Sequence, residues 1–187
     1  MLPVWRLRTM AAMMGEVGAL VADSRIELVL RRKEGDMREF DVRSGEDCVG
    51  ILAVKLETNA DGVPAARVER AFRGRNSVGP PGAFAQAYNR LFEALAIDRV
   101  ISSLTRSQFA EEFWSARLYP PDGFALYRVT YSYWEIGPER NGSERWNDEV
   151  VKYRDYPYEW VFSRLGVGVE EAPHSTAVLW KTGQQSE

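Results

Sequence analysis

Apolar and polar residues alternate along four short segments in the first part of the chain. The alternation covers residues 25–31, 38–43, 48–57 and 65–72, and turns rich in Gly, Asp, Asn and Ser separate them. Such alternation is typical of strands with one buried face, and such turns join neighbouring strands. The pattern predicts an antiparallel meander. Ahead of it, residues 3–8 alternate as a short strand, and residues 9–22 carry apolar positions at helical spacing.

After this meander the apolar residues change from alternation to helical spacing. Six apolar residues recur at helical spacing and predict a helix that starts just after a loop rich in Gly and Pro at residues 73–82; they are Phe84, Ala87, Tyr88, Leu91, Phe92 and Leu95. Residues 98–104 are predicted as a strand, and residues 107–118 as a helix introduced by a capping box of Thr105 and Gln108. That helix is expected to place Phe109, Ala110, Phe113, Trp114 and Leu118 inward. Residues 124–136 form a long alternating aromatic strand.

Length and charge narrow the class of protein. A chain of 187 residues suggests one domain, which we divide into residues 1–136 and an aromatic C-terminal extension, 137–187, packed on the same domain. The net charge of −3 argues against a nucleic-acid partner, because such partners call for a basic surface. No segment is apolar enough to cross a membrane. We therefore expect a cytoplasmic protein.

Cysteine and histidine are too scarce for several kinds of site. The chain has one cysteine, Cys48, which is expected to be a buried strand residue, and one histidine, His174. Structural and catalytic zinc sites draw mostly on these two residue types, so no metal site is expected. A Cys–His catalytic pair is disfavoured for the same reason.

The loop at residues 73–82 is the first candidate site. A helix begins directly after it, and the N-terminus of a helix offers free N–H groups and partial positive charge to an anion. A loop of small residues allows a phosphate to approach them. A structural turn explains such a loop equally well.

Two stretches resemble the GCN5-related N-acetyltransferase (GNAT) superfamily. "AFRGR", the Gly-rich turn and "AQAYNRLFEAL" are similar to the family's fourth strand, pyrophosphate loop and third helix, and "VISSLTRSQFAEEFWSARLYPPDGF" is similar to its fifth strand and following helix. The resemblance covers residues 4–134. It implies a mixed α/β (α+β) fold in which helices flank a mainly antiparallel central sheet.

The resemblance also implies a cofactor and site residues. Acetyl-CoA would place its pyrophosphate at the helix that starts near Gly82 and its pantetheine between the strands at 65–72 and 99–104. The residues expected to bind the cofactor are Arg73, Arg75, Gly79, Gly82 and Ala83. Glu69 is the candidate base for an amine, and Tyr119 is the candidate acid for the CoA thiolate.

The chain departs from the family pattern at three places. Phe84 stands where the family has Gly or Ala, and it crowds the pyrophosphate unless its ring turns into the core. Pro80 and Pro81 remove two N–H donors from the loop. Trp114 stands where the family has the Tyr that protonates the thiolate.

Two functions stay open. The first is an acyl-CoA-dependent N-acyltransferase that acts on an amine-bearing small molecule or protein. The second is a catalytically inactive GNAT-like protein that binds and regulates or inhibits a protein partner through the aromatic C-terminal segment, where Tyr and Trp favour an interface as well as a core. A homodimer is compatible with both functions.

Overall fold

The computed structural model describes most of the chain, and the account below is confined to residues 25–59, 62–74, 79–131, 142–146, 149–167, 169 and 175–183. The strand at 3–8 and the helix at 9–22 that the sequence predicts lie outside these residues. The division at residue 136 also falls outside them and stays a prediction.

The predicted meander is confirmed. Four consecutive strands pair antiparallel with their neighbours: β1 (Ile26–Glu34), β2 (Met37–Ser44), β3 (Asp47–Thr58) and β4 (Pro64–Arg73). Gly35 and Gly45 lie in the tight turns between them with φ of 53° and 61°, a conformation that glycine adopts without steric cost. The sequence predicts these strands from the alternation of apolar and polar residues, and the clearest alternation of buried and partly exposed side chains is in β2, around Phe40 and Val42.

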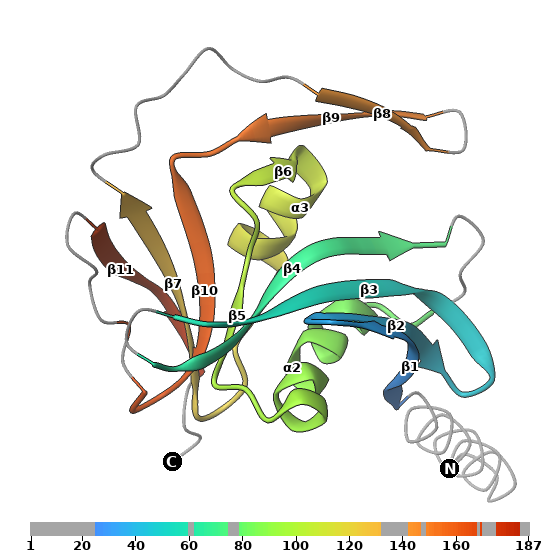
Figure 1. Cartoon of the computed structure of the whole chain (residues 1–187), viewed down its shortest axis with the longest axis horizontal. Helices are drawn as coiled ribbons and strands as arrows, with labels where there is room; N and C mark the ends of the chain where they lie inside the picture. Colours follow the sequence, from blue (N-terminus) through green and yellow to red (C-terminus); the bar gives the residue numbers. More distant parts are fainter. Residues whose placement is uncertain are drawn as a thin grey trace, which may run out of the picture.

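The main sheet has eight strands in the order β1-β2-β3-β4-β5-β10-β7-β11 (Figure 1). Its second half consists of β5 (Arg99–Ile101), β7 (Phe124–Tyr131), β10 (Tyr158–Arg164) and β11 (Ser175–Thr182). Among the described pairings of this sheet, β4 with β5 is parallel and the rest are antiparallel. The predicted mixed fold with a mainly antiparallel sheet is confirmed.

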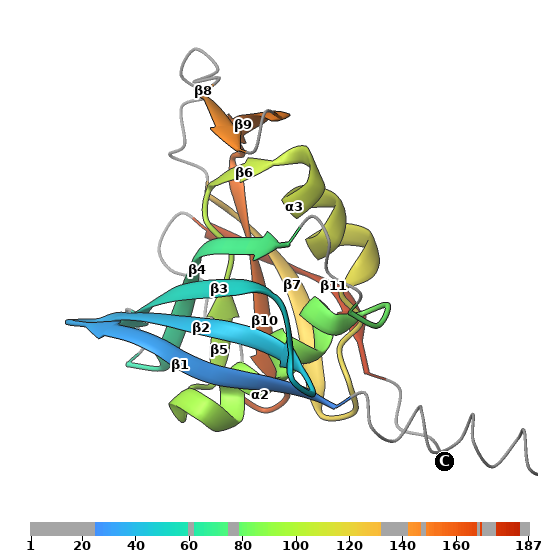
Figure 2. The same cartoon turned by 90° about the vertical axis from the view of Figure 1, so that its right-hand side faces the viewer.

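A small second sheet lies at one end of the main sheet. It has the order β6-β9-β8, formed by β6 (Thr105–Ser107), β8 (Gly142–Trp146) and β9 (Glu149–Asp155). Figures 1 and 2 both place its β8–β9 hairpin at the tip of the molecule, beyond the helix that follows β6.

The helix predicted from the apolar stripe is α2 (Ala83–Leu95). Its buried residues Ala87, Tyr88, Leu91 and Phe92 pack in the main core with side chains from β1 to β4, β7 and β10. Burying an aliphatic or aromatic side chain of this size contributes roughly 1.5–3 kcal/mol. This stripe therefore fixes α2 against one face of the sheet.

The second predicted helix differs from the expectation. It consists of a short α-helix, α3 (Gln108–Glu112), continued by a π-helical turn, η1 (Phe113–Arg117), in which the Leu118 N–H donates to the Phe113 carbonyl at 2.8 Å. The inserted residue shifts the helical phase by about 100°, since 3.6 residues make a turn. Trp114 and Leu118 are buried as predicted, but Phe109 is 77% exposed.

This helix begins where the sequence predicts, but its cap is not the predicted capping box of Thr105 and Gln108. Thr105 lies in β6, and the N-cap is Ser107, whose Oγ accepts from the Ala110 N–H at 3.1 Å. The strand predicted at 98–104 is shorter, since β5 spans only Arg99–Ile101.

Cys48 is exposed, which corrects the expectation of a buried residue. The pairing of β2 with β3 skips Val49, because Val42 is opposite Gly50 while Arg43 is opposite Cys48. This bulge reverses the alternation at the start of β3, and Val49 is fully buried in place of Cys48.

Candidate functional site

The parallel pair β4–β5 opens after three residue pairs. Ala65, Ala66 and Arg67 lie opposite residues 99–101, after which β5 ends while β4 continues to Arg73 beside β3 alone. Figure 1 shows the two strands diverging from this point. An unpaired strand edge presents N–H and C=O groups that can bind an extended ligand.

Glu69 lies at the start of this open edge. It is the extra residue of a β-bulge, because Ala53 is opposite Arg70 whereas Val54 is opposite Val68. Glu69, Arg70 and the next residue of β4 are exposed. Bulges re-aim a side chain at the edge of a sheet, so the candidate base projects from the place where β5 leaves β4.

The N-terminus of α2 follows β4 through the Gly/Pro loop. Gly82 is its N-cap with φ of 77°, and no side chain caps the helix or places an acid in its first turn. The Ala83 N–H donates to the Pro80 carbonyl at 3.2 Å, and the first intrahelical bond runs from Gln86 to Gly82. The N–H groups of residues 84 and 85 therefore have no intrahelical partner and can serve an anion.

The described part of the loop is held against β3. The Arg73 guanidinium donates to the Gly79 carbonyl at 3.0 Å. A Cβ on Gly79 would lie 2.5 Å from Cγ1 of Val49, so only glycine fits there. Gly79 thus packs on the sheet, Arg73 braces the loop, and Arg75 lies outside the described residues.

The Phe84 side chain turns away from the N-terminus of the helix. Its ring packs partly buried against the main core, and its Cζ would be 2.7 Å from a Cβ on Gly50. The ring covers the glycine of β3 instead of the free N–H groups. The anion site is therefore not obstructed by this departure from the family pattern.

Trp114 lies in η1, and Tyr119, the candidate acid, follows η1 in the chain. Trp114 is 2% exposed and packs edge-on against Tyr88 with ring centroids 5.1 Å apart, so it belongs to the core. Tyr119 is 69% exposed, and its described contact is with Lys181, whose Nζ lies 4.2 Å from the ring centroid. No described contact joins Tyr119 to Glu69 or to α2.

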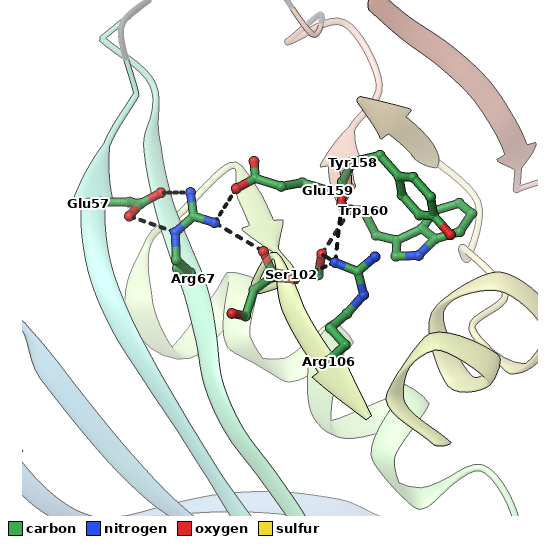
Figure 3. A network of polar contacts seen from close by, with 8 residues as sticks. Glu57, Arg67, Ser102, Arg106, Tyr158, Glu159 and Trp160 are labelled. Atoms are coloured by element: carbon green, nitrogen blue, oxygen red, sulfur yellow. Dashed lines mark hydrogen bonds and ion pairs between the residues drawn. The ribbon is translucent and has the colours of Figure 1, made fainter. Parts of the chain in front are cut away.

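A polar network that the sequence did not predict lies at the same point of separation (Figure 3). On the sheet face turned away from α2, Arg67 donates to both carboxylate oxygens of Glu57 at 2.9 and 3.1 Å and to Glu159 at 2.5 Å. Burial lowers the pKa of Arg67, but its hydrogen bonds and attraction to the two carboxylates outweigh this effect and leave the pKa raised. Arg67 also donates to the Ser102 carbonyl at 3.0 Å.

A second network lies on the face that α2 and α3 cover. The buried Arg106 donates from Nε to Glu111 at 2.8 Å. The same carboxylate accepts from the Tyr158 hydroxyl at 2.7 Å and from the Trp160 indole N–H at 3.0 Å. Burial, followed by the hydrogen bond to Glu111, raises the pKa of Tyr158 to about 12.

Ser102 connects the two networks, as Figure 3 shows. Its carbonyl accepts from Arg67 on one face, and its Oγ accepts from Arg106 at 3.1 Å and from the Trp160 backbone N–H at 2.9 Å on the other. Ser102 is the first residue after β5, so this hydroxyl fixes the strand where it parts from β4. The mixture of charges and aromatics in "YRDYPYEW" was the one sequence signal for this region.

Among the described residues, no group of three or more His, Cys, Asp or Glu side chains is arranged to hold a metal ion. Within the same part of the chain, no helix is both long and apolar enough to span a bilayer.

An open parallel pair beside a helix N-terminus, within a mainly antiparallel sheet, is the arrangement that the resemblance to the GNAT superfamily implies. No protein-family model and no curated protein sequence matches the chain. Several solved structures match its fold, among them GNAT and other acetyltransferases.

Three of these solved structures contain acetyl-CoA or CoA. A GNAT family acetyltransferase from Elizabethkingia anophelis with acetyl-CoA bound is 4% identical, with 74% of this chain and 98% of that chain covered and a TM-score of 0.43. A Bacillus subtilis acetyltransferase in complex with CoA is 10% identical, with 75% and 99% covered and a TM-score of 0.43. Spermidine N-acetyltransferase from Vibrio cholerae in complex with CoA and spermine is 10% identical, with 69% and 67% covered and a TM-score of 0.38. At these sequence identities the similarity concerns only the path of the backbone.

Proposed function

We propose that the chain binds an acyl-CoA at the opening between β4 and β5 and transfers the acyl group to an amine. The observation that carries this proposal is the parallel pair β4–β5, which separates after three residue pairs. The uncapped N-terminus of α2 lies at the end of the loop that follows β4. The amide groups of the pantetheine arm match the open edge of β4. The pyrophosphate matches the free N–H groups at the start of α2.

In this proposal Arg73, Gly79, Gly82 and Ala83 shape the phosphate end of the site, together with Arg75 on the loop. Arg73 and Gly79 hold the loop to the sheet, and Gly82 leaves space, because a Cβ built on it meets nothing within 4 Å. The remaining N–H groups and the absence of an acid from the first turn of α2 favour a dianionic group.

The reaction would use Glu69 as the base. The amine nitrogen attacks the thioester carbonyl carbon, a C–N bond forms as the C–S bond breaks, and Glu69 takes the proton from nitrogen. The leaving thiolate takes a proton from Tyr119, the candidate acid. Glu69→Gln is expected to lower kcat at least about tenfold with unchanged acetyl-CoA affinity, and Tyr119→Phe tests the acid in the same way.

Isothermal titration with acetyl-CoA and with desulfo-CoA tests the binding site. We expect micromolar binding of both ligands by the natural chain, since the phosphate and pantetheine contacts do not need the sulfur. Gly82→Asp places a carboxylate at the helix N-terminus and is expected to weaken binding at least about tenfold, or about 1.4 kcal/mol. Gly82→Asn is the matched neutral control, because Asn and Asp both tolerate positive φ.

Comparison of the two variants distinguishes a loss of phosphate binding from a distortion of the backbone. Loss of binding in Gly82→Asp with retention in Gly82→Asn supports a phosphate site at α2. Equal loss in both variants points to backbone strain at residue 82. Failure of the natural chain to bind any CoA species overturns the proposal.

A second candidate is a GNAT-like protein that binds a protein partner without catalysis. It is favoured by the core position of Trp114 and by Val178, Leu179 and Trp180, which are 43–54% exposed on the edge strand β11. Sedimentation of the purified chain over a range of concentrations tests whether a second copy is that partner. CoA binding without turnover on any amine would favour this candidate.

A further inference from the structure

Three arginines of the described chain each lie close to two aromatic rings. Their guanidinium carbons are 4.5–5.5 Å from the ring centroids, a separation typical of cation–π contacts. The contacts are Arg106 with Tyr156 at 4.5 Å and Tyr158 at 5.3 Å, Arg164 with Phe92 at 5.4 Å and Phe124 at 5.2 Å, and Arg128 with Tyr158 at 5.3 Å and Trp180 at 5.5 Å.

Two of these arginines also have a carboxylate. Arg106 is paired with Glu111 at 2.8 Å, and Arg164 with Asp98 at 3.5 Å. Arg128 has no ion pair or side-chain hydrogen bond with any described residue, and its Nε is shielded from solvent without an acceptor. The same aromatic setting is thus completed by an anion at two positions and left incomplete at the third.

The described side chains around Arg128 include one carboxylate. Arg128 and Arg106 share the Tyr158 ring between them, and the one described carboxylate in contact with this cluster is Glu111, which Arg106, Tyr158 and Trp160 hold. Arg106 therefore has a carboxylate partner among the described residues, and Arg128 has none. An anion at Arg128 would supply that missing partner.

The geometry leaves room for that anion at the edge of the guanidinium. Tyr158 and Trp180 lie within cation–π distance of the Arg128 guanidinium, whose N–H donors point outward in its own plane. Trp180 is itself held in place, since its indole N–H donates to the Ser115 carbonyl of η1 at 3.0 Å. Because Arg128 is only half-buried and its Nη atoms are not among the shielded unpaired atoms, those atoms reach solvent.

We propose that the Nη edge of Arg128, between Tyr158 and Trp180, binds an oxyanion, the carboxylate or phosphate group of a small ligand. A guanidinium binds such a group through two parallel N–H donors, and two neighbouring rings restrict the orientation of the side chain before the ligand arrives. Arg128 lies on β7, with β10 between it and β5, so this site is separate from the opening between β4 and β5 and does not depend on acyl-CoA binding.

Titration with inorganic phosphate, acetate and chloride at constant ionic strength tests this site. The readouts are the NMR signals of the Arg128 Nε–H and of the Trp180 indole N–H, assigned with Arg128→Gln and Trp180→Phe. We expect saturable shifts with phosphate or acetate at least about fivefold tighter than with chloride. Whichever of the two binds more tightly identifies the ligand group as a phosphate or a carboxylate.

Three variants make the test specific. Arg128→Gln is expected to abolish the saturable shift of the indole signal, and Arg128→Lys to weaken it at least about threefold, because an ammonium keeps the charge but lacks the planar fork. Arg164→Gln is the matched control, since Arg164 has the same two-ring setting but already holds Asp98. It is expected to leave the titration unchanged.

Several results would overturn the proposal. One is a linear, non-saturating shift with all three salts, which denotes screening alone. Another is equal loss of the response in Arg164→Gln and Arg128→Gln. If Arg128→Gln unfolds, the comparison of Arg128→Lys with the natural chain decides the question.

Discussion

Arg67 and Arg106 lie on opposite faces of the main sheet, and both networks reach Ser102 at the end of β5. Arg67 is partly exposed and has two carboxylates, Glu57 and Glu159. Arg106 is only 3% exposed and has one described carboxylate, Glu111, supplemented by neutral oxygen atoms and two rings. The more deeply buried charge thus has the fewer counter-charges, so the two faces should differ in sensitivity to the loss of one carboxylate.

Removal of Glu111 should produce the largest effect. Glu111→Ala leaves Arg106 buried without a counter-charge and removes the acceptor of Tyr158 and Trp160, so the free energy of unfolding should fall by about 3–5 kcal/mol. Glu111→Gln keeps an acceptor oxygen and should cost less. Urea denaturation of both variants measures the difference, and a loss below about 1 kcal/mol for the alanine variant would contradict a buried, singly paired arginine.

Removal of the Ser102 hydroxyl should have an intermediate effect. Ser102→Ala leaves a donor of Arg106 and the Trp160 backbone N–H without their acceptor, which should cost about 1–3 kcal/mol. Ser103→Ala is the matched control, because the described contact of Ser103 with Arg106 uses its backbone carbonyl. Equal stability of the two variants would show that the hydroxyl does not hold the networks together.

Removal of Glu57 should cost less than removal of Glu111. In Glu57→Ala, Arg67 keeps Glu159 and the Ser102 carbonyl, and its partly exposed side chain can be hydrated, so we expect a loss of about 0.5–1.5 kcal/mol in urea denaturation. A loss as large as that of Glu111→Ala would remove the distinction between the two faces.

High pH should give the effect that is most specific to one side chain. The pKa of Tyr158 is raised from 10.0 to about 12, so the folded state keeps a proton that the unfolded chain releases. The corresponding stability is fully present below about pH 10 and is lost as pH rises towards about pH 12. Tyr158→Phe should flatten the decline of unfolding free energy over this range, and an unchanged slope would contradict the raised pKa.

The sequence could predict elements that are defined by a period. The strands of the meander and α2 follow from alternation and from the stripe of Tyr88, Leu91 and Phe92, because in both elements the buried face is written locally. The π-helical turn was missed since one inserted residue leaves the apolar stripe nearly unchanged in sequence. It is visible only through the hydrogen bond from Leu118 to Phe113.

The candidate site was predictable in part. The loop and α2 were located from glycine, proline and helical spacing, while the bulge at Glu69 depends on pairing with β3 and is absent from the pattern. The networks that meet at Ser102 join side chains up to 92 residues apart in sequence, the separation of Arg67 and Glu159. No local period brings Glu111 to Trp160, so only the sheet order could reveal it.

The position of β10 has a consequence for folding while the chain is being synthesised. β10 is inserted between β5 and β7, although it follows both in the chain. A nascent chain that has emerged only as far as Tyr131 therefore exposes the edges of β5 and β7 that face β10 in the folded protein. These two strands do not pair with each other in the folded sheet, so both edges wait for β10. Such edges attract other strands, so the interval before residue 164 leaves the ribosome is when this chain is most exposed to aggregation and most in need of chaperones.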